Sequence, residues 1–234
     1  MILSLSALRE ERHALRTALG LKASGTLQGL ELDTGSGWTH LCFGMGAERL
    51  KGALELGLEV FAPKFVVLVG FSVALRPELR VGDLLCDSRS NEEVLKYLRN
   101  CSSLSVRLAE VQEAGFLHSV SEKVAFAKDY PQAELADLET ASFFSILAGR
   151  VPSLALRAVS DELETSLPLN FGEFVNARGF PDMPGILGQL ARRPHTVPKL
   201  IRLGRDANVA AVRLGSALTC LEPFLSKFQG PDRS

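Results

Sequence analysis

The feature that most constrains the fold is the uninterrupted apolar run FVVLVGF at Phe65–Phe71. A strand with one face in water alternates apolar and polar residues, whereas a strand buried on both faces reads as continuously apolar. A second run, SLALRAVS at 153–160, is similarly apolar apart from Arg157 and leads directly into Asp161. The two runs predict the buried, largely parallel sheet of an α/β protein.

Shorter patterns predict the other elements around this sheet. Ser6 can cap a first helix that runs to about Leu19 and is closed by Gly20. A strand within AELADLE, a helix through ASFFSILAG and the run at 153–160 together predict a βαβ unit with parallel strands. The remaining predicted elements are a strand pair within 25–34, a strand at 39–44, a helix from about Glu48 to Val60, a strand after the turn at 76–85, one or two helices between Asn91 and Gly115, and a last helix at about 206–225.

The length of 234 residues suits one domain with a substantial core. We expect this domain to span residues 1–228, because the chain has no repeats and no low-complexity linker. The proline-rich stretch 164–205 is expected to be an irregular elaboration of the domain, and residues 229–234 a flexible tail.

The composition excludes several classes of function. The net charge of −1 argues against nucleic acid as a partner, because binding to phosphate backbones needs a cationic excess. We expect no signal sequence and no membrane-spanning segment, which would need about 18 to 20 apolar residues. The cysteines and histidines lack metal-ligand spacing, so we expect no metal, no other cofactor, and idle thiols in a reducing cytoplasm. The four cysteines are Cys42, Cys86, Cys101 and Cys220.

Polar residues gather where the two strands of the predicted βαβ unit end. Asp137 and Glu139 follow the first strand, and Ser160 and Asp161 follow the second. Because ligands bind beyond the carboxyl ends of parallel strands, these residues would meet at one rim of a cleft. The alternative is that they are solvated caps of the helices that follow them.

Glu11 falls on the apolar stripe of the first helix, three residues after Leu8 and four before Leu15. A carboxylate on an inward face must be paired, hydrogen-bonded or protonated. The alternative is that Glu11 tilts outward to pair with Arg12 or Lys22. Three acids around one cleft suit the cleavage of a glycosidic bond through an oxocarbenium-like transition state.

Several segments of the chain resemble a known family, the nucleoside phosphorylase superfamily, and within it the methylthioadenosine/S-adenosylhomocysteine nucleosidases. YPQAELADLETASFF at Tyr130–Phe144 resembles the family's F-P-Q-A segment, strand and E-M-E helix start. RAVSD at 157–161 resembles R-A-I-S-D, and SALREER at 6–12 resembles the G-A-M-E-E-E run after the first strand. GFSVALRPELRVGDLL at 70–85 resembles the glycine-rich strand end and L-x-V-G-D. The segments keep the family's order over most of residues 1–165.

The resemblance implies a three-layer α/β/α sandwich with a central mixed, largely parallel sheet, and a role for each matching residue. Asp161 would be the general acid that protonates the purine at N7, and Ser160 would help to fix that carboxyl and the base edge. Glu139 would accept hydrogen bonds from two ribose hydroxyls, with Leu138 packed under the ribose. Glu11 would activate the attacking water, and the helix pattern selects the same residue.

The chain departs from the family at other substrate-binding positions. Phe71 and Ser72 stand in the glycine-rich strand end, where small residues let the backbone approach the substrate. Asp137 replaces the family's first Glu, and the aromatic residue that stacks on the base has no clear counterpart near 120–121. These departures leave open a family member that binds a nucleoside without catalysis.

The attacking nucleophile could be water or, as in the phosphorylases of the superfamily, inorganic phosphate. Gly44 and Gly46 could form part of a phosphate cradle of backbone N–H groups, and Arg76 or Arg157 could supply charge. The alternatives are that the glycines only form a turn and that Arg157 is a buried partner of one of the acids. Because Glu11 can activate water, hydrolysis is the simpler interpretation.

The segment LARRPHTVPKLIRLGRDA at 190–207 mixes basic with apolar residues. It resembles the extended C-terminal part of the hopanoid-associated phosphorylase-like branch, whose proposed substrate is an adenosyl group on a triterpene lipid. An anionic membrane surface or a lipidic substrate would suit this mixture, and the alternative is a solvated helix with an inward apolar stripe.

We therefore expect a cytoplasmic enzyme that releases the base from an adenosine-type purine nucleoside by hydrolysis. Phosphorolysis and non-catalytic nucleoside binding remain the alternatives. The resemblance also implies a homodimer in which the neighbouring chain closes the substrate's 5′ pocket.

Overall fold

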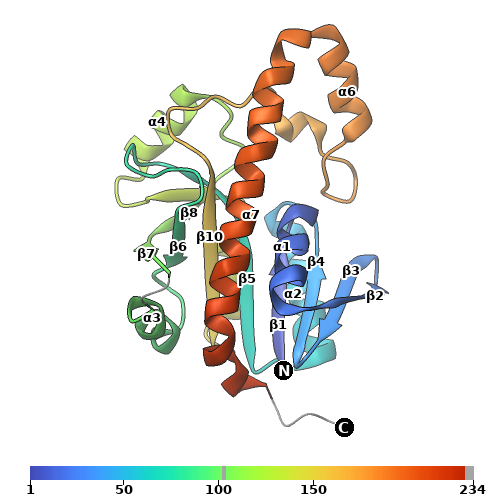
Figure 1. Ribbon diagram of the computed structural model, residues 1–234, viewed down its shortest axis with the longest axis vertical. Helices are drawn as coiled ribbons and strands as arrows, with labels where there is room; N and C mark the ends of the chain where they lie inside the picture. Colours follow the sequence, from blue (N-terminus) through green and yellow to red (C-terminus); the bar gives the residue numbers. More distant parts are fainter. Residues whose placement is uncertain (102–103, 230–234) are drawn as a thin grey trace.

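The computed structural model describes residues 1–101 and 104–229 and places the apolar run at the centre of a ten-stranded mixed sheet (Figure 1). The main strand order is β2-β3-β4-β1-β5-β10-β6-β7, while β9 pairs with β5 and β8 pairs with β9. The strands are β1 (Ile2–Ser6), β2 (Lys22–Leu27), β3 (Leu30–Gly35), β4 (Trp38–Cys42), β5 (Phe65–Ala74), β6 (Leu84–Asp87), β7 (Val106–Ala109), β8 (Val111–Glu113), β9 (Leu135–Asp137) and β10 (Ser153–Asp161). The helices are α1 (Arg9–Leu19), α2 (Ala47–Phe61), α3 (Glu92–Arg99), α4 (Val120–Asp129), α5 (Thr140–Leu147), α6 (Met183–Arg192) and α7 (Val197–Leu225), with single 3₁₀ turns at Phe171–Phe174, Pro194–Thr196 and Ser226–Phe228.

Strand β5 lies between two parallel neighbours, β1 and β10, and it is buried on both faces because helices pack on each side of the sheet. Successive side chains of a strand point to opposite sides of the sheet. Phe65 and Val67 accordingly join one hydrophobic core, while Val66 and Leu68 join another. The buried parallel sheet that the apolar run predicts is confirmed.

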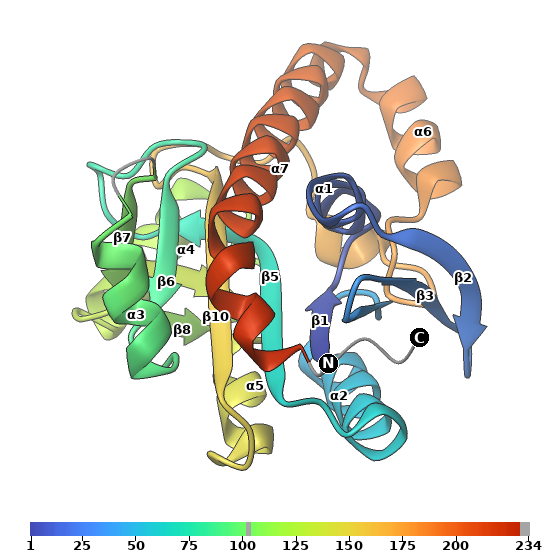
Figure 2. The same cartoon turned by 60° about the horizontal axis from the view of Figure 1, so that its bottom comes forward.

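Helices cover both faces of the sheet, which gives the predicted α/β/α sandwich. The first core lies between the sheet and the helices α1, α3 and α7, which contribute Leu15, Val94 and Leu214. The second core lies between the sheet and the helices α2 and α5, which contribute Leu54 and Phe143. Figure 2 shows α7 running across the sheet beside β5 and β10, with α1 next to it.

The predicted βαβ unit is wrong in the direction of its first strand. β10 runs parallel to β5, but the three-residue strand β9 runs antiparallel to it, through the pairs Val73–Ala136 and Ala74–Leu135. The other neighbour of β10 is β6, also antiparallel. The residues after β9 and those at the end of β10 are therefore not brought together by a parallel crossover. They lie near each other because β9 and β10 both pair with β5.

Two predictions about helices also need correction. Ser6 is the last residue of β1 and not a helix cap, because α1 begins at Arg9 and the Glu11 side chain accepts the hydrogen bonds at its start. Gly20 closes α1 as predicted, with a φ of 63°. Between 91 and 115, α3 is followed by the strands β7 and β8, where a second helix had been an option.

The stretch 164–205 is more regular than predicted, since it contains α6 and the beginning of α7. Pro194 and Pro198 stand at the first positions of helical turns, where the missing N–H leaves no hydrogen bond unmade. Of the predicted tail at 229–234, all but Gln229 lies outside the described residues.

The sequence led us to expect no segment with the length and composition of a membrane span, but the helix α7 has both. In the described part of the chain, one helical stretch, Pro194–Phe228, reaches a mean hydropathy of 1.2, and 44% of its most apolar window is buried. Leu214, Leu218 and Leu221 of this helix pack against the sheet. Much of its apolar character is therefore that of a core helix.

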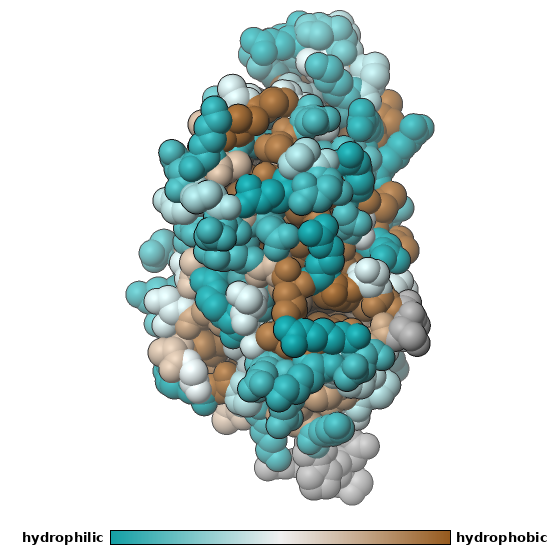
Figure 3. All heavy atoms as spheres, turned by 90° about the vertical axis from the view of Figure 1, so that its left-hand side faces the viewer, coloured by the Kyte–Doolittle hydropathy of each residue, from teal (hydrophilic) through white to brown (hydrophobic). Residues whose placement is uncertain are grey.

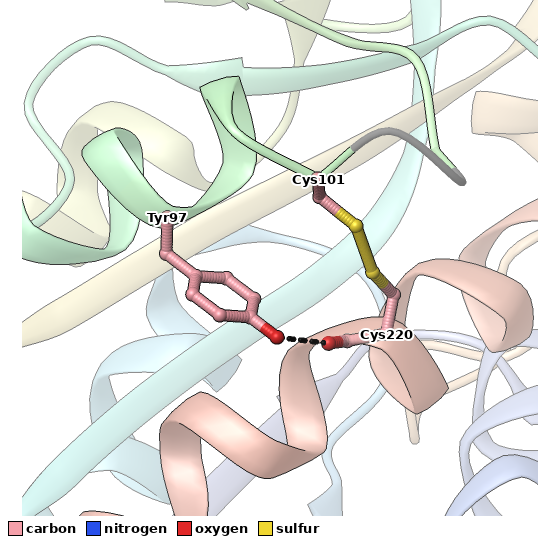
Figure 4. Close-up of a disulfide and its surroundings, with 3 residues drawn as sticks. All are labelled: Tyr97, Cys101 and Cys220. Carbon is pink, nitrogen blue, oxygen red and sulfur yellow. Dashed lines mark hydrogen bonds between the residues drawn. A yellow bond between two sulfur atoms is a disulfide. The ribbon is translucent and has the colours of Figure 1, made fainter.

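Cys101 and Cys220 form a disulfide, so the prediction that all four cysteines are idle thiols is wrong for these two (Figure 4). The bond joins the segment after α3 to α7 across 119 residues, and the Tyr97 hydroxyl donates a hydrogen bond to the carbonyl oxygen of Cys220 at 3.1 Å. Sequence spacing gives no sign of such a pair, because the fold alone brings the two segments together. Cys42 and Cys86 are free, and burial raises the pKa of each thiol to about 12.

Candidate active site

Glu11 lies inward at the start of α1, as the apolar stripe predicts, with 3% of the residue exposed. Its Oε2 accepts hydrogen bonds from the backbone N–H groups of Ala7 and Leu8, each at 2.9 Å, and its Oε1 accepts one from Phe71 at 2.8 Å. The carboxyl group therefore caps α1 and ties it to β5. Arg12 pairs with two acids of β3 and not with Glu11.

Burial raises the pKa of Glu11 to about 7, against the opposing effects of its backbone hydrogen bonds and of Arg157. A carboxyl group with this pKa changes its protonation state close to neutral pH. That is the range in which a general base works most effectively.

Arg157 was predicted either to supply charge to a phosphate site or to be a buried partner of one of the acids, and the structure shows the second. Its Nη2 lies 2.5 Å from Asp137 Oδ2 and 3.9 Å from Glu139 Oε2. Its Nε and Nη2 donate to the hydroxyl of Thr140 at 2.9 and 2.7 Å. Asp137 also accepts hydrogen bonds from the N–H groups of Glu139 and Thr140, so its contacts hold the start of α5.

Gly70 allows Arg157 and Glu11 to approach β5 closely. A Cβ atom at Gly70 would overlap Arg157 Nη1 and would lie 3.2 Å from Glu11 Oε1. Any side chain at this position would therefore displace the guanidinium group. This glycine belongs to the strand end in which the family resemblance was found.

Glu139 lies at the start of α5 with 4% of the residue exposed. Its Oε1 accepts a hydrogen bond from the N–H of Gly46 at 2.9 Å. Burial raises the pKa of Glu139, the charge of Asp137 raises it further, and Arg157 opposes the change. The charge of Glu11 also raises the pKa of Glu139, and Arg157 acts in the opposite direction on both carboxyl groups.

The turn Gly44–Gly46 uses its N–H groups within the protein. The N–H of Gly44 donates to Ala7, that of Met45 donates to Gly179, and that of Gly46 donates to Glu139. The two glycines have φ values of 80° and 108°, which other residues adopt only with strain. The turn is thus a rigid support for Glu139, and none of these three donors is left for a phosphate group.

Arg76 was the other candidate for an anion site, and the structure does not bring it to the glycine turn. Its guanidinium donates to the carbonyl oxygen of Pro131, which precedes β9, whereas Glu139 follows β9. Arg76 therefore lies at the opposite end of this strand.

Asp161 lies at the end of β10 with 5% of the residue exposed. Its Oδ2 forms an ion pair with Lys123 Nζ at 2.7 Å, and its Oδ1 has no hydrogen-bond partner among the described residues. Burial raises the pKa of Asp161 to about 6, although Lys123 acts in the opposite direction. A buried carboxyl oxygen without a partner is costly, so a ligand that donates to it, or accepts its proton, would be favoured.

A cavity of about 350 Å³ lies beside Asp161, between the end of β10 and α7. This volume is within the range of small-molecule sites, roughly 300 to 1,000 Å³. Ser160, predicted to accompany Asp161, also lines the cavity. The remaining lining residues are Val81, Glu162, Glu164, Thr165, Ser166, Leu167, Pro168, Lys199, Arg202, Leu203 and Asp206.

Two strands connect the cavity to the group formed by Glu11, Glu139 and Arg157. On β10, Arg157 pairs with Gly70 of β5, and Asp161 pairs with Val73. The predicted substrate-binding residues of β5 lie between these pairs; Phe71 is half-buried, and Ser72 is buried and donates to a β10 carbonyl. Leu138 is half-buried next to Glu139. The acids are thus spread along the carboxyl-terminal parts of β5 and β10 and do not meet at a single point.

Lys123 lies at this edge and was not predicted from the sequence, and neither was the exposed ring of Phe116, which lies outside the lining of the cavity. Lys123 of α4 is fully buried, and besides Asp161 its ammonium group donates to the carbonyl oxygens of Glu162 and Thr165. Phe116 is 37% exposed and packs over Gly172. No sequence pattern indicates that Lys123 is buried, because a lysine in an amphipathic helix normally points to solvent. Phe116 precedes residues 120–121, the positions near which an aromatic residue was expected from the family resemblance.

The chemistry that the site offers comes from its buried acids. Among residues 1–101 and 104–229, no group of three or more His, Cys, Asp or Glu side chains could hold a metal ion. Asp161 and Glu11 can both exchange protons near neutral pH, with pKa values of about 6 and 7. This arrangement suits general acid–base chemistry on a small molecule.

Solved structures of nucleosidases match this architecture over nearly the whole chain. Futalosine hydrolase of Helicobacter pylori strain 26695 aligns with a TM-score of 0.73 at 14% identity, over 96% of this chain and 97% of the hydrolase. The 5′-methylthioadenosine/S-adenosylhomocysteine nucleosidase of Neisseria meningitidis, in complex with methylthio-immucillin-A, aligns with a TM-score of 0.72 at 14% identity, over 96% and 99% of the two chains. A putative nucleosidase of the same kind from Borrelia burgdorferi, bound to adenine, aligns with a TM-score of 0.71 at 13% identity, over 96% and 100%.

No protein-family model and no curated protein matches the chain. The likeness to the solved nucleosidases nevertheless extends over 96% of this chain. The chain therefore shares the α/β fold of these solved nucleosidases, which confirms the three-layer sandwich that the sequence resemblance implies.

Proposed function

We propose that the protein hydrolyses the N-glycosidic bond of a purine nucleoside and releases the base. The observation that carries this proposal is Asp161, a buried carboxyl with one unpartnered oxygen that lines a cavity of about 350 Å³. The fold shared with solved nucleosidases supports it.

Asp161 is the proposed general acid. Its pKa, raised to about 6, allows part of the protein to carry the carboxyl proton near neutral pH. Transfer of this proton to a ring nitrogen of the base makes the base a neutral leaving group. Ser160 lies in the same cavity wall and positions the base edge.

Glu11 is the proposed general base, and Glu139 the proposed ribose ligand. Glu11 in its ionised form removes a proton from the attacking water, and its backbone hydrogen bonds fix its direction. Glu139 accepts hydrogen bonds from ribose hydroxyls and stabilises the positive charge that develops on the sugar. Arg157 and the Gly44–Gly46 turn hold Glu139 in place.

The engaged N–H groups of Gly44, Met45 and Gly46 support water, and not phosphate, as the nucleophile. A phosphate site needs free backbone donors or a nearby arginine. Arg157 is already paired with Asp137, and Arg76 lies at the far end of β9.

In its most specific form, the proposal is that the substrate is an adenosine-type nucleoside. The solved nucleosidase of Neisseria meningitidis binds methylthio-immucillin-A, and the putative one of Borrelia burgdorferi binds adenine, which supports this substrate class. The family resemblance of the sequence also leads us to propose a homodimer, which sedimentation of the purified protein would test.

The decisive experiment measures base release from a panel of purine nucleosides by wild-type protein and by Asp161→Asn. Loss of a general acid should lower kcat/KM by about 10² to 10⁴-fold. Asp129→Asn is the matched control, because Asp129 is exposed at the end of α4, and it should retain full activity. Equal turnover by Asp161→Asn would remove Asp161 from the mechanism.

Two other outcomes separate the competing functions. Base release that requires inorganic phosphate would identify a phosphorylase and would contradict hydrolysis. Binding of adenine or its nucleosides by the wild type, without base release from any of them, would identify a non-catalytic member of the fold.

A further inference from the structure

Basic charge is concentrated in the helical hairpin formed by residues 183–205. These residues contain five of the 26 Lys and Arg side chains of the protein and none of its 27 Asp and Glu side chains. The rest of the chain is consequently acidic. The five basic residues are Arg192, Arg193, Lys199, Arg202 and Arg205, and each of them is exposed.

This basic hairpin consists of α6, the 3₁₀ turn Pro194–Thr196 and the first turns of α7. Figure 1 shows it projecting from the body at the end opposite to both termini. Ile186 is the one buried residue of α6, so most of this helix faces solvent. On the side that faces the viewer in Figure 3, the upper end of the molecule is mostly hydrophilic, as the concentration of arginines would produce.

Large apolar side chains are exposed on the same two helices. On α6, Met183 and Leu187 are 54% and 59% exposed; on α7, Val197 and Ile201 are 37% and 53% exposed. Within each helix the two residues are four positions apart and therefore lie on one face. Each of the two helices therefore carries exposed aliphatic side chains together with exposed basic ones, and the fold itself covers neither aliphatic pair.

We propose that the basic hairpin binds the surface of an anionic phospholipid bilayer, a property that does not depend on the proposed function. Positive side chains are attracted to the negative headgroups, and aliphatic side chains enter the boundary between headgroups and acyl chains. Nucleic acid would satisfy the arginines but would leave the four aliphatic side chains in water. The combination of both features therefore favours a lipid surface.

The contact is peripheral and does not span the bilayer. The lower part of α7 packs in the core through Leu214, Leu218 and Leu221, which fixes the helix to the body of the protein. Lys199 and Arg202 of the basic hairpin also line the cavity beside Asp161. Binding would thus place this cavity next to the membrane.

Co-sedimentation of the full-length protein with vesicles tests the proposal. One set of vesicles consists of equal parts phosphatidylcholine and phosphatidylglycerol, and the other of phosphatidylcholine alone. We expect binding to the anionic vesicles that weakens as salt is raised and little binding to the neutral ones. Arg192→Gln combined with Arg193→Gln should weaken the affinity roughly 25-fold, at about fivefold for each charge.

The apolar part of the contact requires its own variants. Leu187→Ser and Ile201→Ser should each lower vesicle affinity by about tenfold, because each removes an inserted aliphatic side chain. The matched controls are Lys51→Gln combined with Lys128→Gln, and Val60→Ser, all at exposed positions outside the basic hairpin. These controls should bind like the wild type, and circular dichroism should show that every variant is folded.

Four results would overturn the proposal. They are equal binding to neutral and anionic vesicles, no binding to either, equal losses in the controls, and capture of an oligonucleotide but not of vesicles. Loss of dimerisation in Leu187→Ser or Ile201→Ser, without an effect on vesicle binding, would assign the apolar residues to a contact between two copies of the chain. Base release from soluble nucleosides should be unchanged in all variants, so failure here is distinct from failure of the proposed function.

Discussion

At the scale of single residues, three buried acids have raised pKa values and differ in the partners that hold them. Glu11 is held by backbone N–H groups, Glu139 by a backbone N–H near Arg157, and Asp161 by Lys123. Burial is the largest cause of the raised pKa in each case. These different surroundings let one acid donate a proton while another accepts one.

The pH dependence of kcat/KM follows from these values. The general acid Asp161 must be protonated, so activity is lost as pH rises above its pKa of about 6. The general base Glu11 must be ionised, so activity is lost as pH falls below its pKa of about 7. The active combination is most populated between about pH 6 and 7, and a bell-shaped profile centred there is expected. The measurement is kcat/KM on the same panel of nucleosides as a function of pH. A profile that is flat from about pH 5 to 8 would contradict these roles.

Gly70→Ala is predicted to disturb the acids directly. The added Cβ would overlap Arg157 Nη1, so the guanidinium must move away from Asp137 and Glu139. We expect a loss of about 1 to 3 kcal/mol in the free energy of unfolding, as for other overpacked cores, together with reduced turnover.

The control for this substitution is Gly52→Ala. Gly52 lies within α2, and no atom would be within 4 Å of its Cβ. The change should therefore raise stability by about 0.5 to 1 kcal/mol. Urea denaturation compares the two variants, and a neutral Gly70→Ala would show that Arg157 is not held as described.

The residues that sequence could identify are those that violate a local pattern. Glu11 interrupts an apolar stripe, and Asp161 ends an apolar strand, so both were predicted and both are buried. Lys123 violates no local rule, since its burial arises from a loop that is distant in sequence. The partners of Arg157 could not be assigned because they depend on the packing of α5 against β10.

At the scale of elements, α4 is joined to the end of β10 by one lysine. Lys123 reaches from the buried face of α4 to Asp161 and to the carbonyl groups of the loop that follows. The same contact fixes the loop that forms a wall of the cavity. One side chain therefore affects both the stability of this edge and the protonation of Asp161.

Lys123→Met tests this dual effect. Without the ammonium group the pKa of Asp161 should rise, and the optimum of kcat/KM should move to higher pH. Removing one member of a buried ion pair should also lower the free energy of unfolding by about 3 to 5 kcal/mol. Lys128→Met, at an exposed position of the same helix, should change neither quantity. An unchanged pH profile in Lys123→Met would show that the lysine does not influence Asp161.

Strong local patterns predicted most elements, and tertiary pairing accounts for the errors. The apolar strands, the hairpin β2–β3 and the helix α2 follow from periodicity and glycine positions, and the structure confirms them. The direction of β9 could not be predicted, because its three residues carry no signal and its pairing with the end of β5 sets its direction. Helix α6 lies in a proline-rich segment that looks irregular in the sequence, but Pro184 stands in the first turn of the helix, where proline is tolerated.

At the scale of the whole molecule, the disulfide links two segments that both pack against the first core. Cys101 follows α3, and Cys220 lies on α7, which packs along the sheet as far as the basic hairpin. The bond closes a loop across 119 residues. A closed loop of this length restricts the unfolded chain strongly.

Removal of the disulfide by Cys101→Ser with Cys220→Ser should lower the free energy of unfolding by about 2 to 4 kcal/mol. Reduction of the wild type should have the same effect, and a reductant should not affect the double variant further. Thermal unfolding with and without reductant measures both. An identical midpoint for oxidised and reduced wild type would show that the bond contributes nothing to stability.

The overall architecture was predictable because two apolar strands and several short segments in order constrain it strongly. The position of the cavity was not, since it depends on α7 passing beside the end of β10. Only the assembled molecule brings Lys199 and Arg202 opposite Asp161.

The central claim, hydrolysis of an N-glycosidic bond, is tested most directly by following the oxygen atom of water. Wild-type protein is incubated with adenosine derivatives in phosphate-free buffer made with ¹⁸O-labelled water, and the products are analysed by mass spectrometry. The account predicts free adenine together with a sugar that carries the label at C1. Release of no base from any substrate, or release only after phosphate is added, would contradict it.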